Sequence, residues 1–364
     1  MKFSIDSKKF LEVIKVVEKA SASKTTLPTL EGILIRSNGS DKISIMCTNL
    51  ELSIDTEVDA IVEEEGAICV TAKTLEQMVN QFDGLILVST EEKQKVVISG
   101  NGARYELMSY KSEDFPDIMA PETTESFEIS QNIFGDMIKQ TIFAVSKDES
   151  KGIHCGLRFE LENNLLRLVA LDGYRFAIRE NEIDYFDNNI DFVVKESSMK
   201  EVLSIIKNID DKIIVEKGQS KVVFIVNGYR IISPILEGNY LDFRRAIPNT
   251  ASFTIDMNTA EFISHIKRCA VVINDKNKVP IKLKFSNNKL EMAADTILGS
   301  AKSSFNVDYT NDDEFIIGFN SSFLLDALNA CIEDEFISIS MLSPQSPAVI
   351  RTKNKVHLIL AVKF

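Results

Sequence analysis

The sequence predicts an α+β protein built from three tandem copies of one domain, and two kinds of observation support this. Sequence landmarks recur in the same order, at nearly one spacing, through the 364 residues. Within each copy, segments that alternate apolar and polar residues, typical of strands, stand beside segments with apolar residues at helical spacing. A repeat unit of about 120 residues can bury a core of its own, unlike the shorter units of solenoids.

Three landmarks define the repeat. The first is an aromatic-led triplet followed by an Ile-Lys pair, and it recurs at offsets of 124 and 126 residues. The second landmark recurs twice at an offset of 124 residues, and the third twice at 126. Ordered landmarks at one period indicate an internal repeat. They start at Phe3, Phe127 and Phe253, at Gly32, Gly156 and Pro280, and at Val96, Val222 and Ala348.

Two helices are expected in each copy. In the first copy, helical spacing places four apolar residues on one stripe: Phe10, Leu11, Ile14 and Val17. The second helix is expected near residues 73–82, 197–209 and 321–332 in the three copies.

Strands are expected around these helices, roughly eight in each copy. Asn-Gly and Asn-Asn pairs, which favour tight turns, separate the alternating segments. The clearest alternation is at residues 42–45, 165–168 and 289–292, and the turn pairs begin at Asn38, Asn101, Asn163, Asn227 and Asn287.

Two similar linkers mark the domain boundaries. Phe115 stands two residues before Asp117, and Tyr240 stands two residues before Asp242, with a proline a few residues further on in each case. The predicted domains are residues 1–121, 122–248 and 249–364.

Composition narrows the function classes. The chain has 41 Lys and Arg against 54 Asp and Glu, a net charge of −13. Proteins that grip phosphates usually show a basic balance or stripe, so the acidic balance argues at first sight against a nucleic-acid binder. The N-terminus lacks an apolar core of signal-peptide length, and no segment approaches about 20 consecutive apolar residues. A cytoplasmic protein without membrane contact is expected.

Motifs of catalysis and cofactor binding are absent from the sequence. It has no phosphate-binding glycine loop, nucleophile elbow or zinc-protease motif. The three histidines and five cysteines are scattered without metal-ligand spacing. We therefore expect no metal, no cofactor and no enzyme activity.

Short motifs along the whole chain point to a family. In order they are Met1-Lys2-Phe3, Thr26-Leu27-Pro28-Thr29-Leu30, Thr48-Asn49-Leu50-Glu51, Asp114-Phe115-Pro116, Asp172-Gly173-Tyr174-Arg175, Asp242-Phe243-Arg244-Arg245, Asp326-Ala327-Leu328 and Lys363-Phe364. Each is weak alone. Together, on a threefold repeat, they resemble the bacterial DNA sliding clamps, the beta subunits of the replicative DNA polymerase III holoenzyme.

The resemblance implies a DNA polymerase processivity factor. Two chains would pair head-to-tail into a homodimeric ring of DNA-clamp domains, with helices lining a hole for double-stranded DNA. The ring would do no chemistry, slide along DNA and tether the replicative DNA polymerase. A clamp loader complex, the 3′–5′ exonuclease partner complex and other proteins with clamp-binding motifs are the further partners implied.

A closed ring also reconciles DNA with the acidic charge. Because leaving DNA requires opening an interface, tight phosphate binding is unnecessary, and only the inner helices need be basic. In the first helix Lys8, Lys15 and Lys19 fall within about a 40° arc off the apolar stripe, although an ordinary solvated face would look the same. By the resemblance, the DNA-binding residues are Lys24, Lys73 and Lys151.

The resemblance further implies a partner-peptide cleft between the second and third domains. Apolar walls with two arginines suit a peptide groove, while core packing is the alternative for Leu171, Leu358 and Leu360. Leu241 and Ala361 stand where many clamps have proline, which leaves the peptide preference open. The implied cleft residues are His154, Leu171, Gly173, Tyr174, Arg175, Phe176, Leu241, Arg245, Ala246, Pro347, Leu358, Leu360, Ala361 and Val362.

The implied dimer interface joins the first domain of one chain to the third domain of the other by edge strands and a small apolar cluster. The matching positions are Tyr105 on one side, with Val271 and Val272 on the other. Apolar residues 271–273 directly precede the polar run 274–278. Core packing is an equal alternative for the two valines.

Two other functions remain as alternatives. One is an enzyme in which Asp172, Tyr174 and Arg175 form a catalytic cluster. It is disfavoured because this turn repeats the Thr48-Asn49-Leu50 landmark, which indicates architecture. The other is a clamp-like peptide-binding scaffold that is not loaded on DNA.

Overall fold

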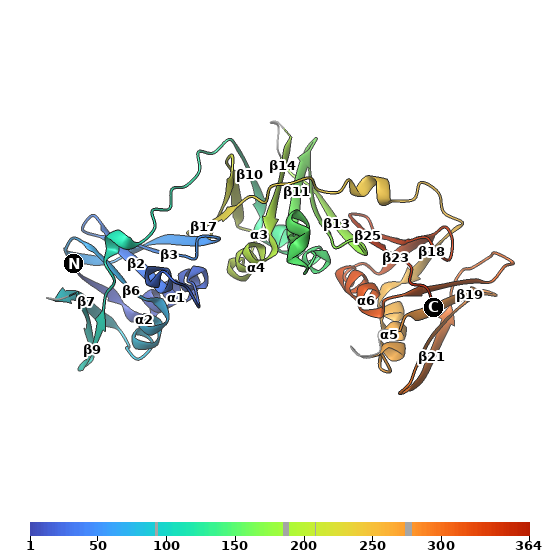
Figure 1. The fold of residues 1–364 in the computed structure, drawn as a ribbon, viewed down its shortest axis with the longest axis horizontal. Helices are drawn as coiled ribbons and strands as arrows, with labels where there is room; N and C mark the ends of the chain where they lie inside the picture. Colours follow the sequence, from blue (N-terminus) through green and yellow to red (C-terminus); the bar gives the residue numbers. More distant parts are fainter. Residues whose placement is uncertain (92–93, 185–188, 208, 274–278) are drawn as a thin grey trace. The chain divides into compact units, whose positions relative to one another are not determined.

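The computed structural model describes residues 1–91, 94–184, 189–207, 209–273 and 279–364, which form helices and antiparallel sheets (Figure 1). The chain divides into two compact units. The first comprises Met1–Asn132 with Ser197–Ile235, and the second comprises Ile133–Glu196 with Leu236–Phe364. Residues 122–248 therefore contribute to both units.

The first unit contains a five-stranded sheet, β5-β1-β7-β8-β9, and an eight-stranded sheet, β10-β15-β16-β17-β4-β3-β2-β6. Helices α1 (Ser7–Val17) and α2 (Ala72–Val79) lie side by side (Figure 1). The strands are β1 (Lys2–Asp6), β2 (Gly32–Asn38), β3 (Lys42–Thr48), β4 (Ser53–Asp59), β5 (Ile61–Glu64), β6 (Ala67–Thr71), β7 (Leu85–Glu91), β8 (Lys95–Gly100), β9 (Ala103–Met108), β10 (Glu125–Ser130), β15 (Lys212–Lys217), β16 (Lys221–Val226) and β17 (Tyr229–Pro234). The other helical segments are α4 (Glu196–Ile205), which enters the unit at Ser197, and the 3-10 turns η1 (Glu18–Ala20), η2 (Pro28–Glu31) and η3 (Ser112–Asp114).

The second unit contains an eight-stranded sheet, β14-β11-β12-β13-β25-β24-β23-β18, and a four-stranded sheet, β21-β20-β19-β22. Its strands are β11 (Gly156–Glu162), β12 (Leu165–Leu171), β13 (Arg175–Glu182), β14 (Ile190–Lys195), β18 (Phe253–Asn258), β19 (Ile281–Ser286), β20 (Lys289–Thr296), β21 (Gly299–Asn306), β22 (Phe315–Phe319), β23 (Phe336–Met341), β24 (Ala348–Arg351) and β25 (Lys355–Ile359). Its helical segments are α3 (Gln131–Lys139), which begins in the first unit, α5 (Thr259–Ala270), α6 (Ser321–Ala330), η4 (Ile142–Ala144), η5 (Glu149–Cys155) and η6 (Phe243–Ala246).

Three copies of one α+β domain follow one another along the chain, as predicted. Each copy opens with a strand and a helix, continues with four or five strands, and then has its second helix and three more strands. The described residues contain nine strands in the first copy and eight in each of the others, close to the expected number. At four of the five expected turns the asparagine has a positive φ between 47° and 52°, at Asn101, Asn163, Asn227 and Asn287. At the fifth, Asn38 ends β2 and Gly39 has the positive φ, 74°.

The first helix begins at a side-chain cap. The Asp6 carboxylate accepts hydrogen bonds from the backbone N–H groups of Lys8 and Lys9 at 3.1 and 3.0 Å, which satisfies two donors that a helix start leaves unpaired. Leu11 of the predicted stripe is only half-buried, and Val13 takes its place on the core side. The buried apolar residues of α1 are Phe10, Val13, Ile14 and Val17.

The second helices end earlier than predicted, at Val79, Ile205 and Ala330. Beyond α2 the chain tightens, and Phe82 N–H donates to the Val79 carbonyl three residues back, at 3.1 Å. Phe82 is nonetheless buried, so the apolar period in the sequence continues past the end of the helix. Residue 208, inside the predicted range 197–209, lies outside the described residues.

The described helices are all too short or too polar to cross a membrane. The five cysteines are free thiols, and the described residues hold no group of three or more His, Cys, Asp or Glu side chains placed to bind a metal ion.

A buried histidine in the second unit predicts a pH dependence. His357 on β25 is 1% exposed, and burial, with a smaller contribution from Lys355, lowers its pKa to about 3. The folded state therefore keeps His357 neutral while the unfolded chain takes up a proton below about pH 6.5. Folding stability contributed by the neutral ring is present above that pH and is lost as the pH falls toward 3.

We expect H357L to remove this acid sensitivity. Between about pH 7 and about pH 5.5, still above the isoelectric point, the unfolding free energy of the wild type should fall by about 1 kcal/mol relative to that of H357L. Urea unfolding of both proteins at the two pH values measures this difference. Parallel losses in the two proteins would show that His357 is not responsible.

Candidate functional site

The centre of the implied cleft is a tight turn between β12 and β13 in the second unit. The Asp172 carboxylate accepts hydrogen bonds from the backbone N–H groups of Tyr174 and Arg175 at 2.9 and 3.1 Å. Gly173 has φ of 93°, a left-handed conformation that glycine adopts without strain. The turn therefore presents the Tyr174 ring, which is 61% exposed, at its tip.

The C-terminal segment runs beside this turn. The Leu360 N–H donates to the Tyr174 carbonyl at 2.9 Å, and the Val362 N–H donates to the Gly318 carbonyl at 2.8 Å. Ala361 packs against the core of the third domain, while the Leu360 and Val362 side chains remain over a third exposed. The exposed Leu360 is thus hydrogen-bonded directly to the Tyr174 turn.

The linker supplies another wall of the cleft. The Leu241 N–H lies 3.4 Å from His154 Nε2, and the His154 and Tyr240 rings meet edge to face at 5.1 Å. Burial, with the charge of Lys151, lowers the pKa of His154, which favours its neutral ring. Leu241 is 54% exposed, and Arg245 and Ala246 of η6 are also exposed.

Three apolar residues of the implied cleft lie in a buried cluster. Leu171, Phe176 and Leu358 are at most 4% exposed and pack in one cluster with Phe243 and Val349. The core alternative therefore holds for Leu171 and Leu358 but not for the exposed Leu360. Pro347 is half-buried in the loop between β23 and β24 and lines a separate small cavity with Leu342 and Val349.

The two arginines of the cleft have different positions. Arg245 has a side chain 88% exposed and pairs with Asp242 at 3.2 Å, so its guanidinium is open to a partner. The Arg175 side chain is 10% exposed and donates to Asp172 at 3.0 Å, to Asp326 at 2.6 Å and to the Phe143 carbonyl at 2.7 Å. Arg175 thus holds the turn against α6 and η4.

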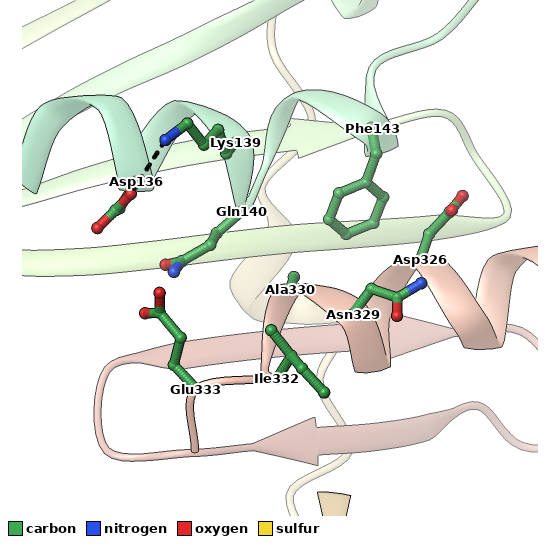
Figure 2. A pocket seen from close by; sticks show the side chains of 9 residues that line it. All are labelled: Asp136, Lys139, Gln140, Phe143, Asp326, Asn329, Ala330, Ile332 and Glu333. Atoms are coloured by element: carbon green, nitrogen blue, oxygen red, sulfur yellow. Dashed lines mark hydrogen bonds and ion pairs between the residues drawn. The ribbon is translucent and has the colours of Figure 1, made fainter. Parts of the chain in front are cut away.

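Asp326, the ion-pair partner of Arg175, lines a cavity that the sequence did not indicate (Figure 2). The cavity has a volume of about 350 Å³ and lies between the C-terminal halves of α3 and α6. Figure 2 shows Gln140 and Glu333 pointing toward each other across it, and Lys139 paired with Asp136 at 3.4 Å. No motif marks these residues, because their grouping depends on the packing of two helices distant in sequence.

The candidate DNA-binding lysines lie in different surroundings. Lys24 is exposed after η1, and Lys73 is exposed in the first turn of α2. The Lys151 ammonium donates to the Asp172 carbonyl at 2.7 Å and lies 5.6 Å from the centre of the Tyr174 ring. Lys151 therefore contacts the cleft turn directly, an arrangement that sequence position alone does not reveal.

The three lysines predicted on one side of the first helix each contact a side chain of the first unit. Lys8 pairs with Asp83 at 2.9 Å, and Lys15 lies 4.0 Å from Glu76. Lys19 lies beyond α1, in η1, and donates to Ser204 at 2.7 Å.

The candidate interface residues lie on an edge strand in the first unit and directly after a helix in the second. Tyr105 lies on β9, an edge strand of the five-stranded sheet, and meets Phe82 edge to face at 5.5 Å. Val271, directly after α5, is 82% exposed, and Val272 is half-buried. The polar run 274–278 lies outside the described residues. An exposed valine does not fit the core alternative for Val271.

The turn geometry explains why a catalytic cluster is disfavoured. Asp172 is engaged by two backbone N–H groups and by Arg175. In the first unit, Asn49 makes the same turn by accepting from the N–H groups of Glu51 and Leu52 at 3.0 and 2.8 Å. The shared geometry indicates a structural turn of the repeat.

Comparisons with known proteins agree with this architecture. Models of the N-terminal, central and C-terminal domains of the DNA polymerase III beta subunit match residues 1–119, 128–242 and 244–361. The chain is 25% identical to the beta sliding clamp of Bacillus subtilis (strain 168), over 100% of both chains. A DNA polymerase III beta subunit structure from Eubacterium rectale is 28% identical, with a TM-score of 0.96 over 100% of this chain and 99% of that one. The Bacillus subtilis sliding clamp structure has a TM-score of 0.96 at 24% identity, with the same coverage.

The threefold α+β repeat defines the class of DNA clamps. The chain belongs to the DNA polymerase III beta subunit family, the bacterial sliding clamps. This confirms the resemblance and the expected function class, a DNA polymerase processivity factor. Sliding clamps are not enzymes, and family membership confirms that expectation as well.

Proposed function

We propose that two copies of this chain close head-to-tail into a ring that encircles double-stranded DNA and slides along it. The observation that carries this proposal is the repeat itself, with an edge strand in a sheet of the first copy, β9, and another in the third copy, β21. An edge strand has unpaired backbone groups that can pair with a strand of another chain. Two different edge strands, one in the first copy and one in the third, suit a closed head-to-tail interface. Tyr105, Val271 and Val272 would lie at this interface.

In this proposal the cleft in the second unit tethers the replicative DNA polymerase by a short peptide. Its exposed rim of Tyr174, Leu241 and Leu360 over a buried apolar floor suits an apolar peptide segment, and the exposed Arg245 suits a carboxylate. A clamp loader complex, a 3′–5′ exonuclease partner complex and other proteins with clamp-binding motifs would use the same cleft. The ring would act in the cytoplasm, where it needs no membrane contact.

DNA contact in this proposal is limited to a few cations, Lys24, Lys73 and Lys151. Because the ring retains DNA by enclosure, these cations need only modest affinity, and the overall charge of −13 is compatible with sliding.

Loading the chain onto circular DNA, and then cutting the DNA, tests the proposal against the alternative of a scaffold not loaded on DNA. The ring should stay on closed circles and run off after linearisation, and K24E/K73E/K151E should load poorly and leave cut DNA in a less salt-dependent way. A protein that never loads, or that stays on linear DNA, would contradict the ring. Unchanged behaviour of the triple variant would contradict only the lysine assignment.

A further inference from the structure

An open groove lies on one face of the eight-stranded sheet in the first unit. It has a volume of about 470 Å³ and crosses β2, β3, β4 and β17. Its floor is apolar, because Leu34 is buried and Met46 half-buried beneath it. The residues that line it include Leu34, Arg36, Met46, Asp55, Glu57 and Arg230.

The internal repeat identifies the corresponding face in the second unit. The strand registers align Leu34, Met46, Asp55 and Arg230 across the first sheet. In the second sheet the registers align Arg158, Val169, Ile178 and Val356 in the same way. Each row lies next to the shared turn, which is at Asn49 in the first sheet and at Asp172 in the second. Arg36 lies two residues after Leu34, and Glu160 lies two residues after Arg158. By this alignment Glu160 is therefore the counterpart of Arg36.

The chain covers this face in the second unit with its own linker. The Tyr240 hydroxyl donates to the Val169 carbonyl at 3.1 Å, and the Arg158 guanidinium lies 5.5 Å from the centre of the Tyr240 ring. Burial raises the pKa of Tyr240 far above its ordinary value. Four residues later, Arg244 donates to Glu160 at 3.2 Å.

Glu160 shows that this coverage includes a charge pair. Burial of Glu160 acts to raise its pKa, but Arg244, Arg167 and Arg158 together outweigh burial and hold that pKa below its ordinary value. This sheet face thus accommodates a segment that carries an aromatic ring and, four residues later in the turn η6, a complementary charge.

The linker of the first unit covers a smaller part of the same face. Phe115 and Tyr110, at the two ends of this linker, pack in one cluster with Leu34 and Met46. The connection from Tyr110 to Phe115 is two residues shorter than that from Leu236 to Phe243. The span between Tyr110 and Phe115 contains no aromatic residue, so nothing from this span takes the place of Tyr240.

The charges of the open groove differ in one respect from those of the covered face. Asp55 and Arg230 pair at 2.8 and 3.1 Å, and Glu57 accepts from Asn38 at 2.6 Å. Arg36 is exposed, and within the described part of the chain no side chain bonds its guanidinium. The position held by the acidic Glu160 in the covered face is thus held by the basic Arg36 in the open groove.

We propose that this groove docks a short peptide of a partner protein that carries an aromatic residue and, four residues later, a carboxylate. The aromatic ring packs on the half-buried Met46 beside the Arg230 guanidinium, and the carboxylate pairs with Arg36. This is a second docking surface, separate from the cleft of the second unit, and it requires neither the ring nor DNA.

The linker sequence supplies the probes for a test. Two labelled peptides would be used, GNYLDFRRAIP, which is residues 238–248, and the same peptide with R244E. Fluorescence anisotropy on the full chain should show tighter binding of the R244E peptide, and R36E should reverse this preference, each by roughly fivefold. The ε-methyl NMR signal of Met46, identified with M46L, should shift on binding.

Two further variants make the test decisive. M46K should abolish binding of the R244E peptide, whereas L360K, which alters the cleft of the second unit, should leave it unchanged. Three outcomes would each overturn the proposal. They are equal affinity for both peptides, loss of binding in L360K, and absence of binding because residues 116–124 already cover the groove. Failure of DNA loading would leave these outcomes unaffected.

Discussion

R175A is expected to weaken both the second unit and its cleft. Removing this side chain leaves the largely buried Asp172 carboxylate without its cation and the Phe143 carbonyl without its donor, and it ends stacking on the Phe323 ring at 4.1 Å. Loss of one partner from a mostly buried ion pair should cost about 2–3 kcal/mol, less than for a fully buried pair because Asp326 is 42% exposed. A lower unfolding midpoint in urea or on heating would show this loss.

The same variant should lose affinity for a polymerase-derived peptide, because the Tyr174 turn is no longer held against α6 and η4. L360K is the matched comparison, since Leu360 is 39% exposed and its change should abolish peptide binding without lowering stability. Unchanged stability in R175A would contradict the positioning role. Unchanged peptide binding in L360K would contradict the location of the cleft.

The fold could be predicted because several independent features of the sequence recur in each copy. Landmarks, turn pairs and strand alternation each recur in three copies, and they depend on local backbone geometry. The ends of the second helices were less predictable, since buried residues such as Phe82 continue the apolar pattern after the hydrogen bonding has changed.

The candidate site could be located from sequence but not oriented. The family resemblance implies that Tyr174, Leu360 and Leu241 belong to one cleft, whereas the inward direction of Arg175 depends on an acidic partner 151 positions away, Asp326. The contact of Lys151 with the Asp172 carbonyl likewise arises only when η5 packs beside the turn. The open groove of the first unit depends on a linker that is two residues shorter than that of the second unit. The effect of this difference is seen only when the two sheet faces are compared.

V271D is expected to separate the proposed ring into single chains. Val271 is 82% exposed in the single chain, so the substitution removes no core contact, while its neighbour Ile273 still packs against the core of the third domain. At the interface, a buried valine would be replaced by a charge without a partner, at a cost of about 2 kcal/mol or more. Because a head-to-tail dimer ring contains two such interfaces, association should weaken by roughly a thousandfold.

Sedimentation at micromolar concentration measures this outcome, with the wild type as a dimer and V271D as a monomer of unchanged stability. I61D is the matched control, because Ile61 is 64% exposed on β5, at the opposite edge of the sheet that contains β9. I61D should remain a dimer and load on DNA, while V271D should lose processivity with the polymerase even though its peptide cleft is intact. A dimeric V271D would place the interface elsewhere, and a monomeric wild type would contradict the ring, because enclosure of DNA, unlike attraction to it, requires both interfaces to be closed.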